Sequence, residues 1–161
     1  MDPILDKARA GQNVLERLMN AIPGFKGYRE KELRRDADRV QREHLASRLE
    51  ECKKALNEVA AQLTRSGSLD LMNEVETARK RLDKVINRIR YADRGYAGFF
   101  DTIKVNEDAL GRVYAFDMAL VTAVERVRSG AEARLAGQML EAIDALDASL
   151  AGREEILSGI R

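Results

Sequence analysis

The sequence has no tryptophan, only two prolines and a single cysteine among its 161 residues. Because Cys52 has no second cysteine to pair with, an intrachain disulfide is excluded, and nothing in the composition points to an oxidising compartment. No segment alternates apolar and polar residues as a strand does, so we assign no sheet. With so few prolines and 34% charged residues, the composition favours long amphipathic helices in one domain.

Long hydrophobic runs are also missing. The longest mostly apolar run, 113–124, has 12 residues and includes Asp117, whereas a membrane-spanning helix needs roughly 20 residues. The first residues, 1–7, lack the basic start and the continuous apolar stretch of a secretory signal. We therefore expect a soluble, cytoplasmic protein.

The sequence offers little for catalysis or for binding metal. His44 is the only histidine, which excludes a di-iron bundle site because that design requires two Glu-x-x-His units. We expect His44 at a helix interface, and Cys52, in an apolar stripe, as an unreactive packing residue. The sequence therefore predicts no catalytic residue, no metal and no other cofactor, and we expect a protein that is not an enzyme.

Charge is unevenly divided along the chain. Residues 1–100 carry 21 Lys and Arg against 16 acids, whereas residues 101–161 carry 7 against 11, so the halves have net charges of +5 and −4. Opposite signs predict either attraction between the halves or an electrically polarised surface. Nucleic acid is an improbable partner, because a nucleic-acid-binding domain is usually basic as a whole.

Apolar residues recur at spacings of three and four along most of the chain, which is typical of amphipathic helices. The expected N-caps are Asp2, Ser68 and Asn106, and the expected ends are Pro23-Gly24, Ser66-Gly67 and Gly130. The helices are predicted at about 2–21, 29–64, 69–92, 107–129 and 131–158. Short turns force consecutive helices to run antiparallel. The sequence thus predicts an all-α fold, an antiparallel four-helix bundle with long coiled-coil-like helices plus an N-terminal helix, in a single domain over 1–161.

The second predicted helix is longer than the third, which leaves its start, around 29–39, without a partner. We expect the first helix to cover this overhang. A second subunit is the alternative, which keeps a homodimer open.

All eight aromatic residues lie beside two breaks between helices, and alternating helices place both breaks at one end of the bundle. Phe25 and Tyr28 are at one break, and Tyr91, Tyr96, Phe99, Phe100, Tyr114 and Phe116 surround the other. These rings either cap the bundle or form a groove for a partner segment or small ligand, with Asp93, Arg94 and Asp101 on its rim. The candidate partner or ligand surface comprises Phe25, Tyr28, Tyr91, Asp93, Arg94, Tyr96, Phe99, Phe100 and Asp117.

Asp117 interrupts an otherwise apolar helix, so we expect it to be buried and paired with a cation or hydrogen-bond donors. Counting along an antiparallel third helix places its partner near Arg81, Lys84 or Arg88. The carboxylate then either fixes helix register or binds a ligand beneath the aromatic cap. Separately, the basic face of the third helix is expected to attract an acidic strip on the last helix, formed by Glu141, Asp144 and Asp147.

Two segments carry a resemblance. Residues 22–32 (IPGFKGYREKE) and 91–101 (YADRGYAGFFD) resemble an uncharacterised family of all-helical bacterial proteins with no known activity. The resemblance implies a bacterial cytosolic helical protein and names no catalytic residue. The long charged helices and amphipathic first helix are more loosely similar to phage-shock membrane-stress proteins, whose first helix binds lipid.

Three hypotheses follow. The first is a non-enzymatic interaction or scaffold protein that binds a partner protein through the aromatic end or the exposed second helix. The second is a peripheral membrane-stress protein that uses its N-terminal amphipathic helix, although the weak basic face of that helix does not favour membrane binding. The third is a small-ligand binder with Asp117 beneath the aromatic cap.

Overall fold

The computed structural model describes residues 2–91, 107–133 and 136–159. The described residues form five α-helices and one short 3₁₀ turn, and no strand occurs among them, which confirms the predicted all-α class. The helices are α1 (Pro3–Ala21), α2 (Arg34–Ser66), α3 (Leu69–Arg90), α5 (Glu107–Glu132) and α6 (Ala136–Gly159), and the 3₁₀ turn η1 spans Lys31–Leu33.

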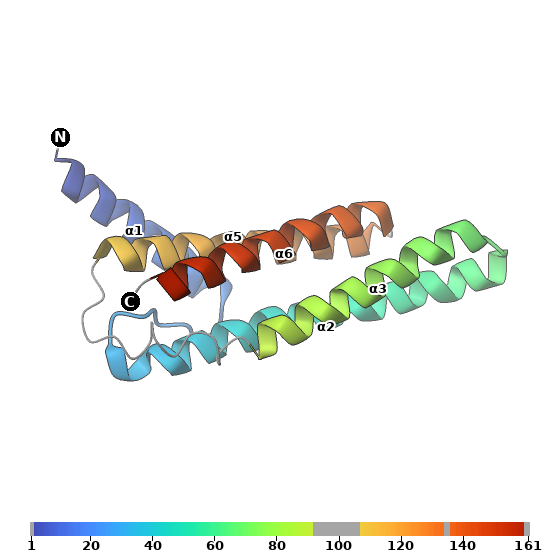
Figure 1. Cartoon of the computed structure of the whole chain (residues 1–161), viewed down its shortest axis with the longest axis horizontal. Coiled ribbons are helices and arrows are strands. Elements are labelled where there is room, and N and C mark those ends of the chain that lie inside the picture. Colours follow the sequence, from blue (N-terminus) through green and yellow to red (C-terminus); the bar gives the residue numbers. More distant parts are fainter. Residues whose placement is uncertain (1, 92–106, 134–135, 160–161) are drawn as a thin grey trace.

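The helices form two antiparallel hairpins that lie side by side (Figure 1). The α2–α3 hairpin packs on the α5–α6 hairpin, α2 against α5 and α3 against α6, so that α3 and α5 lie diagonally across the bundle. Helix α1 packs on α5, and its N-terminal half projects away from the other helices (Figure 1). The buried stripes meet along the common axis, through residues such as Leu49 and Leu56 of α2, Leu82 of α3, Val113 of α5 and Leu146 of α6.

The turn between α2 and α3 agrees with the prediction. Gly67 has a φ of 72°, a left-handed conformation that glycine adopts without steric cost, and its N–H bonds the carbonyl of Leu63. Ser68 precedes α3 as expected but makes no side-chain capping bond, since its hydroxyl lies 3.3 Å from that of Ser66.

Three predicted helix limits were wrong, among them the start of the last helix, which lies at Ala136 instead of 131. The second helix begins at Arg34 instead of 29, because tertiary hydrogen bonds hold the backbone of Tyr28 outside a helical ladder: its carbonyl accepts from Arg34 Nε at 2.7 Å, and its N–H donates to the Tyr114 hydroxyl at 2.9 Å. The fourth helix does not end at Gly130 but continues to Glu132. Gly130 serves packing instead, since a Cβ there would lie 2.9 Å from Met139 Cγ of α6.

The expectation that α1 covers the start of α2 was also wrong. Helix α3 ends opposite Arg42, which donates to the Arg90 carbonyl at 2.6 Å, so residues 34–41 extend beyond α3. This overhang is covered by the link after α1, through Tyr28, and by Arg153 of α6, which bonds Asp38 at 2.9 Å. The described chain therefore supplies a partner for the start of α2 by itself.

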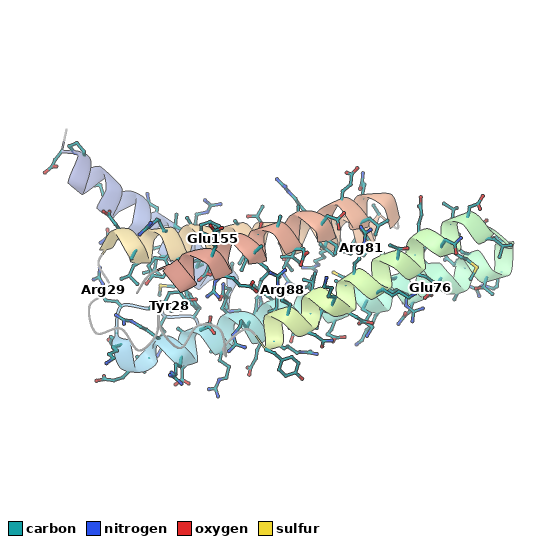
Figure 2. The ribbon with its side chains drawn as sticks, viewed as in Figure 1. Tyr28, Arg29, Glu76, Arg81, Arg88 and Glu155 are labelled. Carbon is teal, nitrogen blue, oxygen red and sulfur yellow. The ribbon has the colours of Figure 1, made fainter. Side chains whose placement is uncertain are left out.

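Ion pairs join the oppositely charged halves, as predicted. Arg81 of α3 binds Asp144 of α6 at 3.0 Å, and Arg88 binds Asp147 at 2.6 Å and Glu154 at 2.8 Å. Figure 2 shows Arg81 and Arg88 along the edge of α3 that faces α6. These contacts confirm that the basic face of α3 meets acids of the last helix.

None of the described helices has both the length and the apolar character that a transmembrane helix requires.

Candidate functional site

Asp117 and Arg153 form the centre of a buried polar cluster between the two hairpins. Asp117 is fully buried on α5, and Arg153, buried on α6, donates from Nε to its Oδ1 at 2.5 Å. The Tyr28 hydroxyl donates to the other carboxylate oxygen, Oδ2, at 2.6 Å. Both oxygens of Asp117 therefore have a donor, one of them charged, as a buried carboxylate requires.

The opposite side of the Arg153 guanidinium faces α2. Its Nη2 donates to Asp38 Oδ1 at 2.9 Å and lies 3.3 Å from Gln41 Oε1 and 3.2 Å from the Tyr28 hydroxyl. Gln41 Nε2 has no hydrogen-bond partner within the described residues. One arginine thus ties α6 to α5, to α2 and to the link that follows α1.

A second arginine extends the cluster to the end of α3. Arg42 Nε donates to Asp38 Oδ2 at 2.6 Å, and its Nη1 donates to the Arg90 carbonyl at 2.6 Å. A cation near the last carbonyls of a helix interacts favourably with the helix dipole. The cluster therefore has no net charge, because its two negative side chains are matched by two positive ones, in Asp38, Asp117, Arg42 and Arg153.

Aromatic rings close the cluster on the side of the α1–α2 link. The Tyr28 ring stacks on Tyr114 at 5.6 Å with 12° between planes, and Phe25 meets Tyr28 edge-on at 5.4 Å. Gly27, with a φ of 89°, lets the link pass close to Tyr114, because a Cβ there would lie 2.8 Å from the Tyr114 hydroxyl. Phe25, Tyr28 and Tyr114 are buried and pack together at this end of the bundle, which is the cap arrangement considered above. Tyr28 is labelled in Figure 2.

The protonation states suit a structural cluster better than an acid–base site. Burial raises the pKa of Asp117, and the guanidinium of Arg153 and the hydroxyl of Tyr28 oppose that rise. Burial, reinforced by the negative charge of Asp117, raises the pKa of Tyr28 well above its ordinary value, so the hydroxyl stays protonated and donates. A ligand would have to displace Arg153 or Tyr28 before it reached the Asp117 carboxylate.

Of the predicted surface residues, the structure brings Phe25, Tyr28 and Asp117 together. Tyr91 follows α3 and is 67% exposed. Asp93, Arg94, Tyr96, Phe99 and Phe100 lie outside the described residues, as does Asp101 of the predicted rim. The burial of Asp117 is as predicted, but its predicted partners were wrong, because α5 packs on α6 and α2 whereas Arg81, Lys84 and Arg88 belong to α3.

The sequence reasoning missed Arg153, Asp38 and Gln41. Their signal is an interruption of an apolar stripe: Arg153 continues the series Met139, Leu146 and Leu150 at helical spacing, and Asp38 lies one heptad before Leu45. A charged residue at a core position predicts a buried partner, as Asp117 did.

His44 and Cys52 occupy the positions expected of them. His44 is partly buried on α2, and burial and the charge of Arg48 lower its pKa. Burial raises the pKa of the Cys52 thiol to about 11, so the thiolate is scarce at neutral pH. Neither residue takes part in the hydrogen bonds of the polar cluster.

A second feature lies at the other end of the bundle. The α2–α3 hairpin extends past the ends of α5 and α6 (Figure 1), and we call residues 57–76 the hairpin tip. Leu69 is 73% exposed and Leu71 49% exposed, while Leu63 and Met72 are half-buried. The tip therefore carries two of the exposed large apolar side chains of the described residues, Leu69 and Leu71.

Comparisons with known proteins add no assignment: no family model, no curated protein and no solved structure matches the chain. Among the residues that the structure describes, no group of three or more His, Cys, Asp or Glu side chains gathers in a way that suits a metal ion.

Proposed function

We propose that this protein is a non-enzymatic interaction protein, a helical scaffold that binds a partner protein through the hairpin tip. The observation that carries the proposal is Leu71, a residue of the apolar stripe of α3 that is 49% exposed at the tip. Leu63 and Met72, which are partly buried, extend the apolar surface of the tip beside Leu71, and an exposed apolar patch is typical of a protein-binding surface. The proposal differs from the predicted binding surfaces, which were the aromatic end and the start of the second helix, because it uses the C-terminal end of α2 and the start of α3.

The groups of the polar cluster are buried and paired with one another, which favours partner binding at another part of the surface. Asp38 and Asp117 are neutralised by arginines, and the side chains of Phe25 and Tyr28 are buried. These groups therefore fit a structural role, in which they hold the helices together. A bundle whose helices are held together by the polar cluster at one end is a suitable scaffold for a binding surface at the other end, the hairpin tip. For that reason the proposal places partner binding at the tip.

Site-specific photocross-linking in cells of the source organism tests this function. We place a benzophenone amino acid at Leu71, and as a matched control at Leu33, which is 40% exposed on η1 at the other end. The expected result is a discrete cross-linked protein from position 71 that is absent from position 33 and that binds the purified chain. A chain that gives no more adduct from position 71 than from position 33 contradicts the proposal.

A further inference from the structure

The edge of α3 that faces α6 changes charge toward the hairpin tip. Glu74, Arg81 and Arg88 are seven residues apart, so they occupy the same position in successive heptads and lie along one edge. Where α6 is present, this edge is basic and holds acids: Arg81 binds Asp144, and Arg88 binds Asp147 and Glu154. At the tip the edge becomes acidic, with exposed Glu74 and, one turn earlier, exposed Asp70.

The apolar stripe beside this edge continues into the tip in the same heptads. On α3, Val85 and Ala78 are buried, and Leu71 at the next equivalent position is 49% exposed. On α2, Leu49 and Leu56 are fully buried, and Leu63 is only partly covered. The tip therefore repeats the surface on which α5 and α6 pack, but without the helices that cover it.

We infer that the hairpin tip receives a basic amphipathic helix from a partner protein, laid on Leu63 and Leu71 as α6 is laid on the core stripe, with a lysine or arginine opposite Glu74. This inference rests on the proposed function and names the chemistry of the partner. Helix-in-groove recognition uses apolar anchors for affinity and flanking charges for orientation and specificity.

Charge also distinguishes this occupant from a second copy of the chain. The tip has four acids, Glu58, Asp70, Glu74 and Glu76, against one base, Arg65, and Glu76 is paired with Arg79 at 2.8 Å. A symmetric contact places the same patch of both copies together. Two tips would then bring their acidic edges together, whereas a basic helix neutralises them.

Defined peptides test the inference with the full chain. The acidic probe is a fluorescein-labelled peptide with the sequence of residues 136–159, and the basic probe is the same peptide with Asp144→Lys, Asp147→Lys and Glu154→Lys. Binding is measured by fluorescence anisotropy at low and high NaCl, after circular dichroism has shown that the two probes have comparable helicity. We expect the basic probe to bind about tenfold more tightly than the acidic one, with the difference shrinking as salt rises.

Variants locate the binding and decide between occupants. Glu74→Lys should reverse the preference between the probes, Leu71→Ser should weaken both, and Glu43→Lys, the same charge change on an exposed part of α2, should alter neither. Equal binding of both probes, no binding of either, or indifference to Glu74→Lys overturns the inference. Dimerisation in sedimentation that Leu71→Ser abolishes assigns the tip to a second copy and also overturns it. The cross-linking result at position 71 is independent of these outcomes, so the proposed function stands or falls separately.

Discussion

Replacing Arg153 with methionine is the most direct test of the buried cluster. Methionine keeps much of the apolar stem of arginine but leaves Asp117 buried without its cation, while Asp38 keeps Arg42. Two unit charges about 4 Å apart at an effective dielectric of about 20 interact by roughly 4 kcal/mol. Breaking a buried ion pair from one side typically costs about 3–5 kcal/mol. Both estimates predict that Arg153→Met lowers the free energy of unfolding by about 3–5 kcal/mol, and Tm by roughly 6–20 °C.

The measurement is urea unfolding followed by circular dichroism at 222 nm, and Arg81→Met is its matched control. Arg81 also joins another helix, α3, to α6 through an aspartate, but its side chain is 47% exposed and that of Asp144 61% exposed, so its loss should cost at most about 1 kcal/mol. The double variant Asp117→Asn/Arg153→Met removes the uncompensated charge and should be more stable than Arg153→Met alone. A loss from Arg153→Met no larger than that from Arg81→Met, or a double variant less stable than Arg153→Met, would show that the buried pair does not stabilise the fold as expected.

Three further outcomes are expected. Gly152→Ala should destabilise the fold by about 1–3 kcal/mol, because its Cβ would lie 2.7 Å from the Phe116 ring, whereas Gly137→Ala, with nothing within 4 Å, should stabilise by up to about 1 kcal/mol; urea unfolding compares them. The Cys52 thiol, with a pKa of about 11, should react with a disulfide reagent at pH 8 far more slowly in the folded protein than in urea, and equal rates would contradict its burial. Because the pKa of His44 lies below its ordinary 6.5 in the folded state, the unfolded chain binds the proton more readily, and stability should fall as pH drops from 7.5 to 5.5; His44→Gln should flatten this slope.

Helix periodicity was sufficient to predict most of the architecture, because the information is local. The stripes of α2 and α3 and the left-handed Gly67 between them follow from spacing and backbone preference. The start of α2 does not, because hydrogen bonds from residues far along the chain, above all Tyr114, decide the backbone conformation of Tyr28. The predicted end of the fourth helix at Gly130 was wrong for a related reason. Gly130 leaves room for Met139 of α6, and no local sequence pattern contains this contact between helices.

The candidate site was predictable in part for the same reason. An aspartate in an apolar helix must be buried and paired, whatever the topology, so the burial of Asp117 could be predicted from its neighbours along α5. Its partner depends on which helices are adjacent and which are diagonal, and several arrangements of four antiparallel helices satisfy the same stripes. Arg81 and Arg88 were predicted as partners of Asp117, but they pair with Asp144 and Asp147. Their predicted attraction to α6 was correct.

The cluster and the hairpin tip are linked through the axial register of the two hairpins. Arg153 reaches both Asp117 and Asp38 within 3 Å at only one offset of α6 along α2, since a slide of one helical turn, about 5.4 Å, would carry its guanidinium out of hydrogen-bond range of Asp38. The same offset places Asp144 opposite Arg81. Beyond the other helices the α2–α3 hairpin continues into the tip (Figure 1), where Glu74 and Leu71 are exposed. The buried charges at one end of the bundle therefore contribute, with the core and the α3–α6 ion pairs, to the axial overlap of the two hairpins, so a change that loosens the cluster should alter binding at the tip without any substitution there.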